Sequence, residues 1–325
     1  MAARRDFTSE TLAAGVRAGD RRALARAITL VENRDPLAYE LVRQLYPRTG
    51  SAAVAGFTGP PGVGKSSLLG ALVGYLRGQD KRIGVVSVDP SSPYSKGALL
   101  GDRIRLADHF LDEGVFIRSM STRGHLGGVA EATLQALLVL DAAGMDVLLL
   151  ETVGVGQSEV EVAMVADTVV LVLQPGSGDS IQALKAGVME IPDLIVINKA
   201  DHPAARTMRT EIRSVLSLDR DREWRVPIVE TEALQGKGVD ALWGAVLDHR
   251  AFLERDGGLD AKRRENIEHE VVAVAISQAR RRLDAALEND PELRSLLDDV
   301  HARRLDPLTA TREIADRVFR RRDEG

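Results

Sequence analysis

The stretch GPPGVGKSS, residues 59–67, decides the fold of this chain of 325 residues. It fits the pattern G-x-x-x-x-G-K-[ST], in which glycines let successive backbone N–H groups turn inward on phosphate oxygens. An apolar run at 52–57 precedes it. Apolar residues at the spacing of one helix face follow it, namely Leu68, Leu69, Leu72, Val73 and Leu76. Strand, glycine loop and helix together predict a phosphate-binding loop, to which the helix N-terminus adds partial positive charge.

Two side chains of this loop have separate expected roles. Lys65 is placed to reach the outer phosphates of a nucleotide, and the hydroxyl of Ser66 is placed to bind Mg²⁺. The backbone of the whole loop is expected to surround the phosphates. The candidate nucleotide-binding residues are therefore Gly59, Pro60, Pro61, Gly62, Val63, Gly64, Lys65, Ser66 and Ser67.

A second motif, Asn198-Lys199-Ala200-Asp201, follows a later apolar strand. In an N-K-x-D loop the Asp carboxylate accepts hydrogen bonds from N1–H and the exocyclic N2–H of guanine, and adenine offers no such pair of donors. Asn and Lys brace the loop and cover the base. Four residues alone are compatible with a polar turn, but at the end of a later strand in a P-loop protein they predict guanine nucleotide as the ligand.

The loop after the last predicted strand holds three further candidates for contact with the base, Glu232, Ala233 and Leu234. GTPases place a backbone N–H near O6 of guanine here. Because Glu stands where Ser is usual, we expect recognition by the backbone only. The alternative is an ordinary strand-to-helix turn that leads to Gly236 and Gly238.

Glu151 ends the apolar strand predicted at 147–151, and Gly154 follows closely. An acidic residue at this place can hold Mg²⁺ through water, and the N–H of Gly154 can sense the γ-phosphate. Many GTPases have a water-orienting Gln directly after this Gly, where this chain has Val155. We therefore expect slow hydrolysis by the chain alone, or help from another loop or a partner. The alternative for Glu151 is a solvated strand end.

Two more carboxylates, Asp89 and Asp102, are candidates for binding Mg²⁺ or water. In P-loop proteins whose second strand lies next to the first, an acidic residue after the second strand faces the γ-phosphate. Asp89 follows the strand predicted at 83–88 and thus joins Lys65 and Glu151 as a candidate catalytic residue. The alternatives are a turn or capping role for Asp89 and a solvated charge for Asp102.

The sequence leaves the roles of His125, Asp179 and Lys185 open. One His without a neighbouring His or Cys is a poor metal site, which favours a hydrogen-bonding role for His125 in its loop. Asp179 is expected to cap the helix that contains Lys185. Both are weaker candidates for a switch loop that begins at Gln174.

Composition argues against several classes of partner. The net charge of −5 gives no positive excess that would favour nucleic acid or an anionic membrane. Aromatic residues make up only 4% of the chain, which argues against surfaces that stack on nucleic-acid bases. No apolar run approaches the ~20 residues that span a bilayer. The chain has no Cys, which removes disulfides, thiolate zinc sites and iron–sulfur clusters and fits a cytoplasmic location.

Seven continuous apolar runs predict an α/β fold with a mostly parallel central sheet, because strands buried on both faces do not alternate. They lie at 52–57, 83–88, 115–119, 147–151, 168–173, 194–197 and 227–231. Charged helical segments flank this region, with later helices starting at Pro291 and Pro307. We expect an N-terminal helical extension at 1–50, a P-loop GTPase domain at 51–258 and a C-terminal helical region at 259–325, whose role in dimerisation is implied only by the family resemblance described next.

Together these motifs resemble one family closely, the MeaB/ArgK group of P-loop GTPases, which is similar to the human methylmalonic aciduria type A protein. The matching segments are GFTGPPGVGKSS, VDPSSPYSKGALLGDR, STRGHLGG, ETVGVGQSE, QPGSGD and NKAD, all between residues 56 and 201. The resemblance implies a GTPase that chaperones an adenosylcobalamin-dependent mutase, first of all methylmalonyl-CoA mutase. Such a protein gates cofactor delivery and protects the mutase. The resemblance also implies a homodimer through the C-terminal helices, and switch loops at 89–105, 151–157 and 174–185.

Two other functions stay open at this stage. A nickel-insertion GTPase shares the motifs but depends on Cys and His ligands, and this chain has no Cys and six His. A P-loop small-molecule kinase does not need an N-K-x-D loop. Tight stoichiometric nickel binding would support the first, and phosphate transfer to a metabolite would support the second.

Overall fold

The computed structural model describes residues 8–89, 109–121, 128–152, 165–177, 192–219 and 222–319. The chain divides into two compact units, Met1–His269 and Glu270–Gly325. The expected division into three parts is not settled by these units and stays a prediction.

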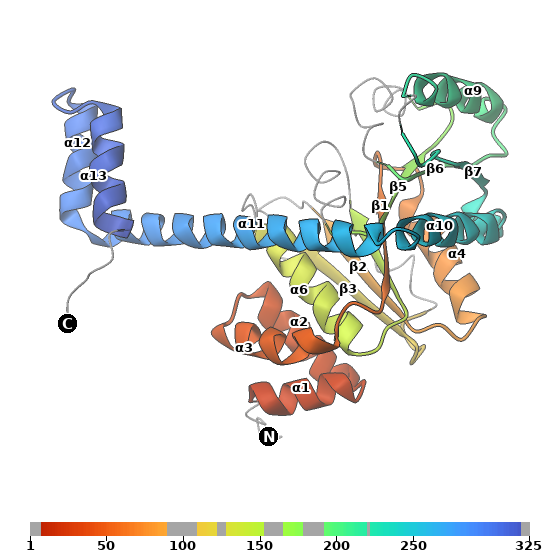
Figure 1. Cartoon of the computed structure of the whole chain (residues 1–325), viewed down its shortest axis with the longest axis horizontal. Helices are drawn as coiled ribbons and strands as arrows, with labels where there is room; N and C mark the ends of the chain where they lie inside the picture. The colour runs from red at the N-terminus through yellow and green to blue at the C-terminus, as the bar shows by residue number, and fades with distance from the viewer. Residues whose placement is uncertain are drawn as a thin grey trace. The chain divides into compact units, whose positions relative to one another are not determined.

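A sheet of seven parallel strands forms the centre of the first unit, in the order β3-β2-β4-β1-β5-β6-β7 (Figure 1). The strands are β1 (Ala53–Thr58), β2 (Ile83–Asp89), β3 (Val115–Ser121), β4 (Val147–Thr152), β5 (Thr168–Leu173), β6 (Leu194–Asn198) and β7 (Ile228–Thr231). They coincide with the seven predicted runs to within two residues at each end. The prediction of an α/β fold around a parallel sheet is confirmed.

Strand β1 occupies the middle of the sheet, between β4 and β5. The register pairs Phe57 of β1 with Glu151 of β4 on one side and with Val170 of β5 on the other. In such sheets, ligands bind outside the carboxyl ends of the strands, where the strand order reverses. The loop that follows β1 therefore lies at the expected binding edge. Glu151 lies near the end of the neighbouring strand β4, at the same edge.

Helices cover both faces of the sheet. On one face α4 (Lys65–Arg77) and α10 (Val239–Glu254) pack on β1, β2, β4 and β5. On the opposite face α9 (Ala205–Leu216) packs on β5 and β6, because it contacts the alternate residues of these strands. On that same face α6 (Gly128–Ala142) separates the sheet from the N-terminal helices. The strands are thus buried on both faces, which explains their unbroken apolar sequences.

The N-terminal segment forms three helices, α1 (Ser9–Arg17), α2 (Arg21–Glu32) and α3 (Pro36–Leu45), followed by the 3₁₀ turn η1 (Tyr46–Arg48). The helical spacing of five apolar residues predicts one continuous stripe here, namely Leu12, Val16, Leu24, Ile28 and Val31. Gly19, at φ 72°, and Asp20, which accepts hydrogen bonds from the first turn of α2, divide this stripe between two helices. Arg118 of β3 forms an ion pair with Glu32 of α2. The extension is therefore part of the first unit's packing.

The C-terminal segment forms α11 (Gly258–Asn289), α12 (Pro291–His301) and α13 (Pro307–Phe319). The predicted helix starts at Pro291 and Pro307 are confirmed. Within the second unit, buried Leu293 of α12 packs with Ile314 and Val318 of α13. Among the described residues, no helix is both long enough and apolar enough to cross a membrane.

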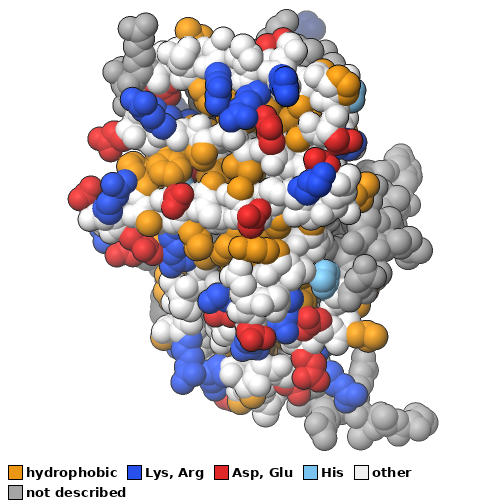
Figure 2. Space-filling view, turned by 90° about the vertical axis from the view of Figure 1, so that its right-hand side faces the viewer, with side chains coloured by type: hydrophobic (Ala, Val, Ile, Leu, Met, Phe, Trp, Pro, Cys, Tyr) orange, Lys and Arg blue, Asp and Glu red, His pale blue; other side chains and the backbone are white. Residues whose placement is uncertain are grey.

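The side of the first unit that lies at the right of Figure 1 carries mixed charges (Figure 2). Basic and acidic side chains lie interspersed in this view, with hydrophobic groups between them. Tyr75 on α4 and Leu247 on α10 are partly exposed hydrophobic side chains. This mixture agrees with the small net charge of the chain.

Candidate nucleotide-binding site

The backbone of the loop between β1 and α4 has the shape that its glycines permit. Gly59 and Gly64 have φ values of 139° and 92°, which L side chains rarely adopt. A Cβ atom at Gly59 would lie 2.1 Å from the carbonyl oxygen of Val172 in β5. Glycine is therefore required at this position both by conformation and by space.

Lys65 opens α4, and its side chain turns back over the loop. Its Nζ donates hydrogen bonds to the carbonyl oxygens of Gly59 at 2.6 Å and Pro60 at 2.9 Å, and the residue is buried. The ammonium group is thus held inside the loop that is expected to surround phosphates. This placement fits the predicted role of Lys65, which remains a prediction for the bound state.

Ser66 and Glu151 meet at the same edge. Ser66 Oγ donates to Glu151 Oε1 at 2.7 Å, and Ser87 Oγ of β2 donates to Glu151 Oε2 at 3.3 Å. All three residues are buried. A solvated strand end is therefore wrong for Glu151. A hydroxyl beside a carboxylate supplies the hard oxygen atoms that Mg²⁺ prefers.

No group of three or more His, Cys, Asp or Glu residues gathers at a metal-binding distance within the described parts of the chain. This does not conflict with a magnesium site at Ser66 and Glu151. Mg²⁺ is commonly held by one or two protein oxygens, together with substrate phosphates and water.

The expectation for Asp89 needs a correction in its premise. Strand β2 does not lie next to β1, because β4 lies between them. The register pairs Val88 with Thr152, so the backbone of Asp89 ends one residue beyond this pair, at the edge where Glu151 ends. The Asp89 side chain lies outside the described residues, as do Asp102, His125, Gly154, Asp179 and Lys185.

Asn198 connects the phosphate loop to two other segments. Its Nδ2 donates to the carbonyl oxygen of Val63 at 2.9 Å. Its Oδ1 accepts from Thr231 Oγ1 at 3.1 Å and from the backbone N–H of Ala233 at 3.2 Å. A Cβ at Gly64 would lie 2.5 Å from Asn198 Nδ2, so the second glycine of the G-x-x-x-x-G-K-S motif makes room for this amide. The bracing role predicted for Asn198 has a geometric basis.

Lys199 also reaches the phosphate loop. Its backbone has φ 58°, and its Nζ donates to the carbonyl oxygen of Gly62 at 3.1 Å and to Gln174 Oε1. Asp201 lies two residues further, exposed in the turn before α9. The phosphate loop and the predicted base-binding loop are therefore joined by two consecutive residues.

The loop after β7 lies beside Asn198. Ala233 is buried and its N–H donates to Asn198 Oδ1, whereas Leu234 is 92% exposed. The carboxylate of Glu232 forms an ion pair with Lys237 at 3.1 Å. The structure therefore accounts for the Glu232 side chain by a contact within its own loop. Recognition of the base by the backbone only stays a prediction.

Ser87 and Gln174 are site residues that the motif analysis did not select as ligands. Ser87 lies within the apolar run of β2, and only the register with β4 places it opposite Glu151. Gln174 follows β5, and only the neighbouring position of β6 brings it to Lys199. Neither relation can be read from local spacing.

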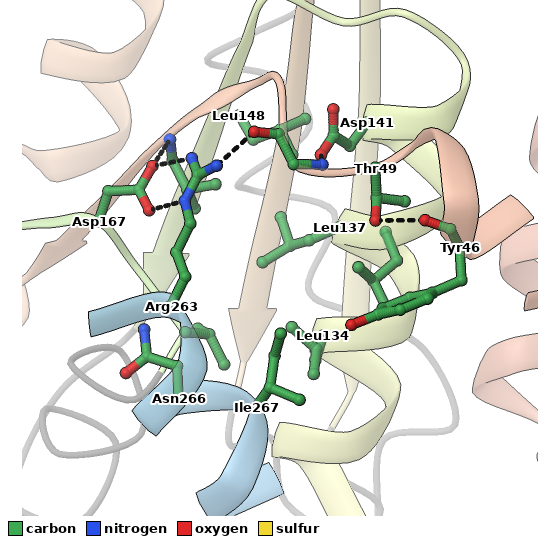
Figure 3. A pocket seen from close by; sticks show the side chains of 14 residues that line it. Tyr46, Thr49, Leu134, Leu137, Asp141, Leu148, Asp167, Arg263, Asn266 and Ile267 are labelled. Carbon is green, nitrogen blue, oxygen red and sulfur yellow. Dashed lines mark hydrogen bonds and ion pairs between the residues drawn. The ribbon is translucent and has the colours of Figure 1, made fainter. Parts of the chain in front are cut away.

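A separate cavity of about 250 Å³ lies at the other end of the sheet (Figure 3). Tyr46, Leu134 and Ile267 form apolar walls, and Arg263 of α11 faces Asp167 beside them. Arg263 donates to both oxygens of Asp167, at 2.7 and 2.6 Å, and to the carbonyl oxygen of Ala52 at 2.8 Å. The start of α11 is thus fixed to the amino ends of β1 and β5.

The site at the carboxyl edge defines a class of protein. A glycine loop after the central parallel strand, followed by a helix that begins Lys-Ser and joined to an N-K-A-D loop, is the arrangement of a P-loop GTPase. The chain belongs to the MeaB family, since residues 24–288 match the family model described as "Methylmalonyl Co-A mutase-associated GTPase MeaB".

Individual relatives agree with this family. A protein of Pyrococcus abyssi is 48% identical over 305 residues, which is 93% of this chain and 94% of that one. The mouse "Methylmalonic aciduria type A homolog, mitochondrial" is 37% identical over 273 residues, 78% of this chain and 66% of its own. The crystal structure of an "LAO/AO transport system kinase" superposes with a TM-score of 0.73 and 30% identity, covering 98% of this chain and 100% of that one.

Proposed function

We propose that this GTPase binds GTP with Mg²⁺ and, through hydrolysis to GDP and phosphate, acts as a chaperone of an adenosylcobalamin-dependent mutase in the cytoplasm. The mutase we propose first is methylmalonyl-CoA mutase. The observation that supports the nucleotide part most strongly is Asn198, whose amide joins Val63 of the phosphate loop to Thr231 and Ala233 beyond β7. The family supports the partner.

In this proposal the residues of the loop bind and orient the phosphates. Lys65 Nζ exchanges the carbonyl oxygens of Gly59 and Pro60 for phosphate oxygens, and Ser66 and Glu151 hold the metal ion. Mg²⁺, when bound, supplies positive charge beside the phosphates. Asp201 is proposed to recognise the guanine edge, and Asn198 and Lys199 keep its loop against the phosphate loop.

The proposed chaperone role needs a slow nucleotide cycle whose GTP-bound and GDP-bound conformations a partner protein can distinguish. GTP and Mg²⁺ would order switch loops, which hydrolysis would release, and so gate cofactor loading. We also propose a homodimer through the C-terminal helices. Within the second unit, Val271, Val272 and Ile276 of α11 are 62%, 57% and 64% exposed, an apolar face of the kind that a second copy can cover.

The experiment combines GTP turnover with cofactor transfer. Phosphate release is measured for the wild type, Lys65→Ala and the control Lys81→Ala, whose lysine is exposed beyond α4. We expect Lys65→Ala to lose turnover and the control to keep it. Adenosylcobalamin loading of apo-methylmalonyl-CoA mutase is then measured with GDP, GTP and a non-hydrolysable analogue. Loading that is the same with and without the protein in every nucleotide state would overturn the chaperone role.

A further inference from the structure

The loops after β5 and β6 are in contact at the nucleotide-binding edge. Gln174 directly follows β5 and Lys199 directly follows β6, and the two strands are parallel neighbours paired at Leu173 and Ile197. Parallel strands end at the same edge of a sheet, which brings the two side chains together. Lys199 Nζ donates to Gln174 Oε1 and to the carbonyl oxygen of Gly62.

The same two loops also lie close together at a second place. Gly176 has φ 76°, and a Cβ added to it would lie in ordinary van der Waals contact, 3.4 Å from His202 Cε1. The Nδ1 atom of His202 accepts a hydrogen bond from the N–H of Ala204 at 3.1 Å, which fixes the orientation of the ring. The loop after β5 therefore lies near the predicted base-binding loop at Lys199 and at His202, on both sides of Asp201.

The physical consequence concerns the freedom of Lys199. A free lysine side chain samples many rotamers, and fixing it costs rotamer entropy. Here the ammonium is held between a carbonyl oxygen of the phosphate loop and the amide oxygen of Gln174. Lys199 also has φ 58°, a conformation that persists only where neighbouring contacts determine it. A ligand that needs Lys199 in this place does not have to order it.

We propose that Gln174 is a positioning residue for guanine-nucleotide binding, which acts by holding Lys199 across the phosphate loop. The inference rests on the proposed GTP site and adds a residue outside both motifs. It also couples the first turn after β5 to the base-binding loop, because Lys199 belongs to the base-binding loop and bonds to Gln174. A movement of either loop that breaks this hydrogen bond removes a restraint on the other loop.

The test is a double-mutant cycle on the full-length protein with fluorescent GDP. Dissociation constants and dissociation rates are measured for the wild type, Gln174→Ala, Lys199→Ala and the double variant. We expect Gln174→Ala to raise the dissociation constant about tenfold, mainly through faster dissociation, since a hydrogen bond to a charged group is lost. In the Lys199→Ala background, the same change should have an effect within about twofold, because Gln174 then has no ammonium to hold.

Two further variants separate positioning from general damage. Gln174→Glu keeps an acceptor oxygen for Lys199 and should bind GDP within about twofold of the wild type. Gln174→Met keeps the length of the side chain without a strong acceptor and should behave like Gln174→Ala, even if alanine perturbs the loop. Gln79→Ala, at an exposed glutamine beyond α4, is the matched control and should bind like the wild type.

The outcomes distinguish the proposed function from this inference. If the wild type does not bind GDP, the proposed function itself is wrong, and the inference about Gln174 fails with it. A wild type that binds GDP, together with unchanged dissociation constants for Gln174→Ala and Gln174→Met, overturns the inference. So does a Gln174→Ala effect that persists in full in the Lys199→Ala background, because Gln174 would then act by another route.

Discussion

The hydroxyl of Ser66 donates a hydrogen bond of 2.7 Å to Oε1 of Glu151, and this contact joins the first turn of α4 to the end of β4. The two residues are 85 positions apart in the chain, yet both are buried at the edge where the phosphate loop lies. A hydroxyl and a carboxylate held together in this way are ready to share a cation.

Removal of the hydroxyl should abolish most turnover. We expect Ser66→Ala to lower GTP hydrolysis about 100-fold, since a bound metal contributes several kcal/mol of charge stabilisation that this oxygen helps to place. Phosphate release across a Mg²⁺ titration measures the effect. Ser214→Ala, at an exposed serine of α9, is the control. Turnover of Ser66→Ala equal to that of the control would contradict the assignment.

Neutralising the carboxylate should separate metal binding from folding. Glu151→Gln keeps the size of the side chain and an acceptor for Ser66 Oγ but removes a buried negative charge. We expect the Mg²⁺ concentration for half-maximal GTPase activity to rise about tenfold or more, because a neutral amide oxygen binds Mg²⁺ more weakly than a carboxylate. The fold should be kept, since the side chain keeps its size and its acceptor for Ser66. An unchanged Mg²⁺ dependence would count against Glu151 as part of the metal site.

Loss of the Asn198 amide should loosen the site and the fold together. Asn198→Ala leaves Val63 O, Thr231 Oγ1 and the Ala233 N–H without this partner. At about 1 kcal/mol for each hydrogen bond, the free energy of unfolding should fall by about 3 kcal/mol, and GDP should bind more weakly. Asn198→Asp retains the acceptor oxygen but buries a negative charge against the carbonyl oxygen of Val63, so it should lose more stability. Urea denaturation of both variants checks this order, and equal losses would disagree with it.

The contact of Arg263 with Asp167 should matter for stability rather than for nucleotide binding. Asp167 is buried, and hydrogen bonding to its carboxylate raises the pKa of Arg263. Arg263→Met leaves this carboxylate without its cation, so the free energy of unfolding should fall by about 3–5 kcal/mol. Asp167→Asn in the same chain should restore part of the loss. Arg264→Met, at the exposed neighbour, is the control, and a loss as large in the control would refute the prediction.

His249 should make the fold less stable at acid pH. It is buried between Thr168 and Asp193, and burial lowers its pKa to about 4 from an ordinary value of 6.5, although Asp193 opposes the shift and Lys262 and Arg222 reinforce it. The unfolded chain therefore binds more protons between pH 4 and 6.5. The stability that the folded state keeps while buried His249 is neutral is fully present above pH 6.5 and is lost as the pH falls from 6.5 to about 4.

The size of this effect is about 3 kcal/mol across the pH window. Urea denaturation at several pH values measures it. In His249→Gln the free energy of unfolding should change less over this window than in the wild type, whereas His301→Gln, at an exposed histidine of α12, should leave the dependence as it is. A wild type and His249→Gln with the same pH dependence would show that another group is responsible.

Local patterns were sufficient for the seven strands and for most helices. Continuous apolar runs predict β4, β5 and β6 because each is buried on both faces, and Pro291 and Pro307 mark helix starts because proline fits the first turn. The N-terminal stripe was less informative. Its periodicity passes through Gly19 and Asp20, where the backbone turns, so one predicted face belongs to two helices.

Strand order was beyond the reach of these patterns. The premise that β2 follows β1 in the sheet was wrong, because β4 enters between them and brings Glu151 next to the phosphate loop. Long-range pairing of this kind depends on which faces the helices between the strands can cover. No local propensity encodes it.

By itself the sequence determined the ligand class, because the spacing within 59–67 and 198–201 specifies backbone shape and donor chemistry over a few residues. Only the tertiary structure decided how those segments act together. Asn198 meets Val63, Ser66 meets Glu151, and Lys199 meets Gln174, and the residues of each pair are at least 25 positions apart in the chain. These contacts arise because parallel strands end at one edge of the sheet, where side chains that are separate in sequence share a single site.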